Sequence, residues 1–302
     1  MLLQSEQQVP ALGVSFPFDV PMPSGSLVKV RADVYNGGGL ALYSGTYTVI
    51  RYECHFCKDS EFVENEFSCG AGMSLGTAAT LQLEDAVVAD HLGCGILVLD
   101  GSQAIVRRSK FLRGQAILGG GLLVAGATAT IYDSLFDLNY CDVGGGAFWA
   151  HLDSTSVTIV NSEVTRNRGL LMGSGLAVSV GAQVTMRGTR VHHNGADSGF
   201  VWGAIVVWNA RLTIRDDCKI YRNKVRYGGG IVVGQGSTLD AQGSYIGENS
   251  AIMDGSQIYL GDGSFFTEEF DNIPDAGIPD PKVRLFDMNI YHNCPTMLNM
   301  DF

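Results

Sequence analysis

One internal repeat runs through most of this chain, and it constrains the fold more than any other feature of the sequence. Its clearest part is a cluster of glycines that opens a short apolar run. Strong copies begin at Gly37, Gly93, Gly119, Gly144, Gly173 and Gly228, and weaker copies at Gly70, Gly203 and Gly255. Because the cluster returns so often and no helical pattern follows it, these glycines are not interpreted as phosphate-binding loops.

A second part of the repeat is a large apolar residue followed three positions later by Asn. The pairs are Phe136 with Asn139, Val164 with Asn167, Val191 with Asn194, Ile220 with Asn223, Ile246 with Asn249 and Ile290 with Asn293. From Phe111 to Ile246 the apolar residue recurs at intervals of 25, 28, 27, 29 and 26 residues. Another strand-like run, which ends in pairs such as Thr130-Ile131, lies between each glycine cluster and its Asn. One period therefore holds three short strands and three turns.

Strands this short are stable only when each pairs with its equivalent in the next repeat. The sequence therefore predicts an all-β fold, a single-stranded right-handed parallel β-helix of about nine coils. At about 4.8 Å per coil, the rod is about 40 Å long. In this prediction residues 26–302 form the helix, residues 1–25 cap or cover it, and residues 262–282 form an extended loop.

Composition agrees with a chain that forms a core. Hydrophobic residues make up 46% and charged residues only 17%, which excludes a disordered or collagen-like protein. No apolar run is long enough for a transmembrane helix, and no secretory signal is recognised, so the compartment stays open. The net charge is −11, yet residues 104–226 carry 14 Lys or Arg against 8 Asp or Glu.

Two columns of polar residues are expected inside the stack. The Asn side chains can form a ladder, because each amide has both donors and acceptors for its copies above and below. Residues small enough for a tight corner stand two positions before the apolar anchor. They are Ser109, Ser134, Ser162, Thr189, Cys218 and Ser244.

The Phe-x-x-Asn-like corner and the glycine-led strand together resemble the repeats of polymorphic outer-membrane proteins. The resemblance covers residues 37–293. It implies a β-helix with a surface or adhesive role, and therefore an extracellular or cell-surface location. In that family a membrane β-barrel follows the repeats, and none is expected after Asn293.

Many β-helices act on polysaccharides, so a carbohydrate-active enzyme of the pectate-lyase-like type is the alternative hypothesis. Glycoside hydrolysis needs two carboxyl groups about 5 to 9.5 Å apart. Asp133 and Asp217 occupy matching positions, but three coils, or about 14 Å, separate them. Asp216 and Asp217 are adjacent, and alternate residues of a strand face opposite ways. We therefore assign no catalytic residues.

The cysteines give no clear pattern for a cofactor. Cys54, Cys57 and Cys69, with His91 and Cys94, leave open a zinc site or a disulfide, but buried free thiols are the favoured interpretation. Cys218, in the column of small residues, is expected to be such a thiol. We predict no metal and no cofactor.

An apolar stripe is predicted on the outer face of the glycine-led strands. If the first and third residues of each strand point inward, the second faces out, and none of these is polar. Either residues 1–25 or a partner subunit is expected to cover this stripe. It comprises Ala41, Leu97, Leu123, Phe148, Ala177, Ile205, Val232 and Ile258.

A basic column is predicted along one edge of the rod, beside the Asn corner. It could bind an anionic polysaccharide or an acidic partner surface, or it could be an ordinary solvated corner. The overall charge and the scarcity of interleaved aromatics disfavour nucleic acid. The column comprises Lys110, Arg113, Arg166, Arg190, His193, Lys219 and Arg222.

These patterns favour a non-enzymatic structural or interaction scaffold. Such a protein would be an adhesin-like surface module or a subunit of a larger assembly, with other protein subunits as partners. The apolar stripe and the basic column are its predicted contact surfaces.

Overall fold

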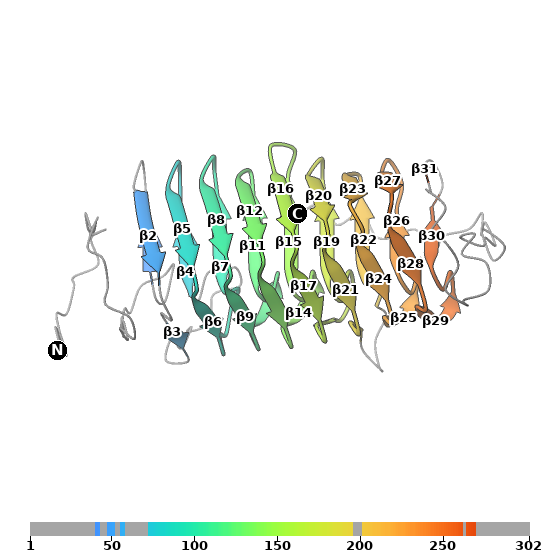
Figure 1. The fold of residues 1–302 in the computed structure, drawn as a ribbon, viewed down its shortest axis with the longest axis horizontal. Coiled ribbons are helices and arrows are strands. Elements are labelled where there is room, and N and C mark those ends of the chain that lie inside the picture. The colour runs from blue at the N-terminus through green and yellow to red at the C-terminus, as the bar shows by residue number, and fades with distance from the viewer. Residues whose placement is uncertain are drawn as a thin grey trace.

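The computed structural model describes residues 40–42, 47–51, 55–57, 72–195, 201–261 and 264–269. The described residues form β-strands and no helix. The strands stack side by side into a rod (Figure 1). All pairings between neighbouring coils are parallel. The predicted fold class, an all-β parallel β-helix, is confirmed.

Three long sheets run the length of the rod. Sheet A contains the glycine-led strands β1 (Leu40–Leu42), β4 (Met73–Leu75), β7 (Ile96–Leu99), β11 (Leu122–Ala125), β15 (Phe148–His151), β19 (Leu176–Ser179), β22 (Ile205–Trp208), β26 (Ile231–Val233) and β30 (Ile258–Leu260). Sheet B contains β2 (Tyr47–Arg51), β5 (Thr80–Glu84), β8 (Gln103–Arg107), β12 (Thr128–Tyr132), β16 (Ser156–Val160), β20 (Gln183–Arg187), β23 (Arg211–Arg215), β27 (Thr238–Gln242) and β31 (Phe265–Glu269).

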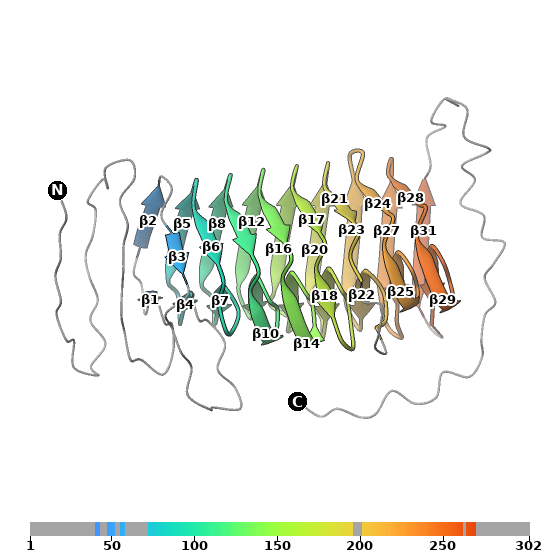
Figure 2. The same ribbon diagram turned by 90° about the horizontal axis from the view of Figure 1, so that it is seen from below.

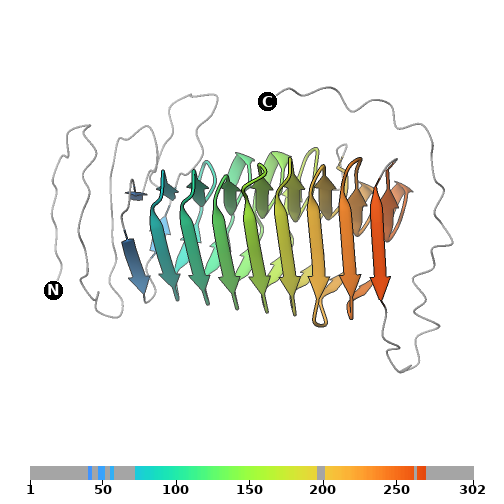
Figure 3. The same cartoon turned by 90° about the horizontal axis from the view of Figure 1, so that it is seen from above.

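Sheet C carries the apolar anchors that precede the Asn corner. Its strands are β3 (His55–Cys57), β6 (Val87–Ala89), β9 (Lys110–Leu112), β13 (Leu135–Asp137), β17 (Glu163–Thr165), β21 (Arg190–His192), β24 (Lys219–Tyr221) and β28 (Tyr245–Gly247). Figure 3 shows the parallel strands side by side in sequence order.

Seven coils between residues 72 and 261 contribute a strand to each of the three sheets. Strands β1 to β3 precede these coils, and β30 and β31 follow them, so the predicted number of coils is close to the observed one. Within the predicted loop 262–282, residues Phe265–Glu269 instead form β31, which pairs with β27. The rest of that loop, apart from Ser264, and the predicted cap at residues 1–25 lie outside the described residues.

A fourth set of strands, which the sequence did not predict, follows the Asn corner in several coils. We call these the D strands, and Figure 2 shows them along one side of the rod. They are β10 (Gln115–Leu118), β14 (Tyr140–Gly144), β18 (Arg168–Gly169), β25 (Lys224–Tyr227) and β29 (Ser250–Asp254).

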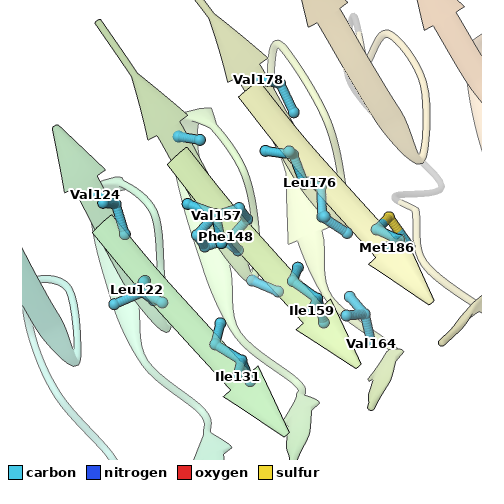
Figure 4. Packing of buried hydrophobic residues seen from close by; sticks show 14 of the residues in the cluster. Leu122, Val124, Ile131, Phe148, Val157, Ile159, Val164, Leu176, Val178 and Met186 are labelled. Carbon is cyan, nitrogen blue, oxygen red and sulfur yellow. The ribbon is translucent and has the colours of Figure 1, made fainter. Parts of the chain in front are cut away.

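Inward-facing apolar residues from sheets A, B and C fill the centre of the rod (Figure 4). Aligned positions in successive coils stack directly. Phe111 and Phe136, for example, lie with ring centroids 4.5 Å apart and ring planes within 4° of parallel. Because each coil completes the core of its neighbours, no coil is expected to be stable alone.

The predicted Asn ladder is present and buried. Asn139 Nδ2 donates to Asn167 Oδ1 at 2.9 Å, and the same bond continues from Asn167 to Asn194 and from Asn194 to Asn223. Each of these side chains also caps backbone groups, as when Asn194 Nδ2 donates to the Val164 carbonyl at 2.9 Å. The amides therefore satisfy one another's hydrogen-bonding groups and those of the backbone at this corner.

The column of small residues forms a second buried ladder at the corner between sheets B and C. Ser109 N donates to Ser134 Oγ, and Ser134 N donates to Ser162 Oγ, both at 3.1 Å. Thr189 and Cys218 continue the column, with Thr189 N 3.4 Å from Cys218 Sγ. Only a small side chain with an acceptor atom fits this arrangement.

Candidate functional site on sheet C

The apolar stripe on sheet A is only partly placed as predicted. Leu97 pairs with Leu123, and Ala177 pairs with Trp149, so these four residues share the outer row. The outer row continues through Val206 and Val232 to Tyr259.

Three residues of the predicted stripe face the other way. Phe148 and Ile205 belong to the central core, and Ile258 packs against it. Their strands begin one residue later after the glycines than the predicted stripe requires. Because side chains alternate along a strand, this one-residue slip turns each of them from the outer to the inner face.

The outer row of sheet A is covered by the same chain. Leu97, Leu123, Trp149 and Ala177 form a second buried cluster with Ala116 of β10 and residues near it. Leu123 is 6% exposed and Trp149 3%. The expected cover was residues 1–25 or a partner subunit, whereas the described cover comes from the D strands. These residues therefore offer no open surface, and the side chain of Ala41 lies outside the described residues.

The basic column lies on the outer face and edge of sheet C. Lys110, Arg190 and Lys219 open strands β9, β21 and β24. The other four residues follow a sheet C strand directly and have φ between 53° and 54°, in the left-handed region that turns the chain into the Asn corner. These four are Arg113, Arg166, His193 and Arg222.

Carboxylates from the same coil or a neighbouring one neutralise most of this column. Arg113 Nε lies 2.7 Å from Asp90 Oδ1, Arg166 Nε 2.8 Å from Asp137 Oδ1, and Arg222 Nε 2.8 Å from Glu248 Oε2. Two longer ion pairs, each 3.4 Å, join Arg190 to Glu163 and Lys219 to Asp217. Five of the seven predicted residues therefore have an acidic partner. Within the described part of the chain, the structure shows no ion pair for Lys110 or His193.

A cluster that we did not predict lies at the centre of this face, on strands β17, β21 and β24. Thr165, His192 and Tyr221 occupy one outward column of sheet C. Glu163 Oε1 lies 2.8 Å from His192 Nε2, and His193 Nδ1 lies 2.7 Å from His192 Nδ1. The four side chains Glu163, His192, His193 and Tyr221, which we call the histidine cluster, thus come together from three coils.

When both imidazoles are neutral, the contacts within the histidine cluster assign a tautomer to each ring. Burial lowers the pKa of His192 below its ordinary value of 6.5, although the nearby Glu163 carboxylate acts to raise it. The lowered pKa favours the neutral ring. Neutral His192 donates from Nε2 to the Glu163 carboxylate and accepts at Nδ1 from His193 Nδ1. Nε2 of the exposed His193 is then an acceptor directed away from this chain of bonds.

Tyr221 completes the cluster. Its ring stacks on His192 with centroids 4.9 Å apart and planes at 19°, and it meets His193 edge-on at 6.2 Å. The Arg222 guanidinium lies 5.8 Å from the centre of the same ring. Contacts on several sides therefore hold the cluster in one arrangement. The signal for it was in the sequence, because reading the coils in register aligns Glu163 with Arg190 and Thr165 with His192.

The other sites that were considered remain without support. Asp133 and Asp217 both lie at the corner between sheets B and C, three coils apart as expected. Among the described residues no group of three or more His, Cys, Asp or Glu side chains could hold a metal ion. Cys94, Cys141 and Cys218 are buried free thiols, while the side chains of Cys54, Cys57 and Cys69 lie outside the described residues.

The chain matches the family model of the right handed beta helix region over residues 48–210 and 152–278. No curated protein and no solved structure matches the chain. The described residues contain no helix that is long and apolar enough to cross a membrane.

Proposed function

Because this chain belongs to the right-handed β-helix family, we propose that it is a non-enzymatic interaction scaffold whose recognition surface is the outer face of sheet C. The observation that carries this proposal is the histidine cluster with the ion pairs around it. It gathers exposed and half-buried polar and aromatic groups on rigid, fully paired strands. Sites on such strands keep their geometry without a ligand, which lowers the entropy cost of binding.

The outer faces of sheets A and B are less suited to recognition than that of sheet C. The outer row of sheet A is buried under the D strands, and the outward positions of sheet B alternate with core residues as in an ordinary solvated face. An adhesin-like role at a cell surface, as the repeat resemblance implies, is part of this proposal. Other protein subunits or an anionic polysaccharide remain candidate partners.

Binding to a panel of immobilised or gel-embedded polymers tests this proposal. We expect the full chain to bind at least one extended polymer and to release no shortened product from it. The double variant Glu163→Gln, Tyr221→Ala should lose that binding while it keeps the parent's unfolding midpoint. A variant that folds and binds like the parent would show that sheet C is not the recognition surface.

A carbohydrate-active enzyme is the second candidate, and one observation favours it. Hydrogen bonds link Glu163 to His192 and His192 to His193. If His193 Nε2 accepted a proton from a substrate, the Glu163 carboxylate would stabilise the resulting positive charge through this chain, as general base catalysis requires. Incubation with the same polysaccharides decides between the two. New reducing ends or unsaturated sugars that disappear in His193→Asn would identify an enzyme, and their absence supports the scaffold.

A further inference from the structure

We propose that the histidine cluster binds a neutral polysaccharide, with His193 Nε2 accepting a hydrogen bond from a sugar hydroxyl. This inference rests on the proposed function, because it names the ligand of the same face. It differs from the expectation of an anionic ligand, and the difference comes from the ion pairs.

The first step concerns charge. Arg166, Arg190 and Arg222 each have a carboxylate partner in an adjacent coil, namely Asp137, Glu163 and Glu248. An anionic ligand would have to compete with carboxylates that are already held at hydrogen-bond distance on a rigid sheet. It would also meet those carboxylates as repulsive neighbours, which makes the face a poor site for a polyanion. An uncharged ligand complements a face on which positive and negative groups balance.

The second step concerns hydrogen bonding. His193 is exposed and its Nδ1 is engaged with His192, so the contacts within the cluster leave its Nε2 available as an acceptor in the neutral ring. The ion-paired guanidinium groups use only part of their five N–H donors. A sugar hydroxyl both donates and accepts, so it can donate to His193 Nε2 and accept from a neighbouring arginine. The cluster thus offers both kinds of partner that a hydroxyl needs.

The third step concerns the shape of the ligand. Neighbouring strands of sheet C lie about 4.8 Å apart, so a ligand that contacts the histidine cluster and the ion pairs of the coils beside it must be extended. The half-buried Tyr221 supplies a planar aromatic side chain whose orientation is set by stacking on the buried His192. Rigid aromatic side chains contribute contact area at low entropy cost, which suits the apolar faces of sugar rings.

A polypeptide is the weaker fit. Extended peptides typically bind a sheet by adding a strand to a free edge. Strands β17, β21 and β24 are each paired on both sides, so their edges are not available. Side chains alone would have to hold the peptide, without backbone hydrogen bonds.

Affinity electrophoresis of the full chain tests the proposal. The native gels contain galactomannan or hydroxyethyl cellulose as neutral probes, polygalacturonate or alginate as anionic probes, and gelatin as an extended polypeptide. We expect retardation by a neutral polysaccharide that persists from about 0.05 to about 0.5 M salt, because no counterions are released. His193→Asn, which tolerates the left-handed backbone but removes the acceptor, should weaken that binding about tenfold, as expected for one lost hydrogen bond.

Arg108→Asn is the matched control, since Arg108 is exposed and has a similar left-handed φ of 46°, but lies at the corner between sheets B and C, outside the basic column. It should bind like the parent. Tyr221→Phe separates the ring from its hydroxyl and should retain most of the binding. Retardation by polyanions alone, abolished at high salt, would overturn the neutral ligand but leave sheet C as a recognition surface. Retardation by gelatin alone would overturn it in favour of a polypeptide. Retardation by none of the probes would overturn a polysaccharide ligand and leave a protein subunit as the partner of sheet C.

Discussion

At the scale of single residues, the corners of the rod depend on side chains that replace backbone partners. The Asn side chains donate to carbonyls and to one another, and they accept from the backbone N–H of the preceding coil. All are buried, so each lost partner would leave a polar group without compensation. The ladder therefore explains why Asn recurs at this position from Asn139 to Asn249.

We predict that Asn194→Ala destabilises the protein by about 1 to 3 kcal/mol. The substitution removes the acceptor of Asn167 Nδ2 and the donor to the Val164 carbonyl, both inside the rod. Chemical denaturation of the variant and the parent measures the difference. Asn161→Asp is the control, because Asn161 is exposed and Asp also tolerates its φ of 49°. If Asn194→Ala and the control had equal midpoints, the ladder would not contribute to stability.

At the scale of elements, the D strands and the glycine turns give sheet A two covered faces. Strands β10 and β14 contribute Ala116, Leu118 and Val143 to the cluster over the outer row, and glycines then return the chain into sheet A. Gly146 shows why glycine is needed, because a Cβ there would lie 2.1 Å from the Ser174 carbonyl oxygen and 2.6 Å from that of Arg168. The glycine cluster is therefore a point of close approach between neighbouring coils.

We predict that Gly146→Ala destabilises the rod by about 1 to 3 kcal/mol, because backbone atoms of the next coil must move to admit the methyl group. Gly243→Asn is the matched control. Gly243 has a φ of 56°, which Asn tolerates, and a Cβ at this position would meet no atom within 4 Å. The control should lie within about 0.5 kcal/mol of the parent in the same denaturation experiment. Equal losses in both variants would contradict the close-approach explanation.

At the scale of the whole molecule, stability is distributed along a stack in which each coil contacts its neighbours. Two histidines that are buried or partly buried make that stability depend on pH. Burial lowers the pKa of His151 and of His192 below the ordinary value of 6.5. The unfolded chain therefore binds protons on these residues more readily than the folded rod does. Their contribution to stability is complete above the ordinary histidine pKa, and it is lost as the pH falls from there through the lowered pKa of the folded state.

We predict that the denaturant midpoint decreases between about pH 7.5 and about pH 5.5, and that the decrease is smaller in the double variant His151→Gln, His192→Gln. The two substitutions remove groups that titrate differently in the folded and unfolded states. Midpoints measured across this range in both proteins test the effect. An equal decrease in both would assign the pH dependence to other groups.

The period of the sequence by itself determined the architecture. Glycine clusters and Asn corners recur at nearly constant spacing, and strands that short can be stable only in a parallel stack, so the fold class and both interior ladders followed from the pattern. Asn194 and Cys218 could be placed correctly because their columns have the same side-chain chemistry in coil after coil.

Only the tertiary structure decided which faces are open. Phe148, Ile205 and Ile258 were assigned to the wrong face because alternation along a strand makes a one-residue slip reverse the side. The cover over Leu123 was missed because the D strands have no strong repeat of their own, and their pairing is set by the coils on either side. The histidine cluster joins Glu163 to His192 across 29 residues of chain. Such a contact depends on the register of neighbouring coils, which the local sequence of neither residue encodes.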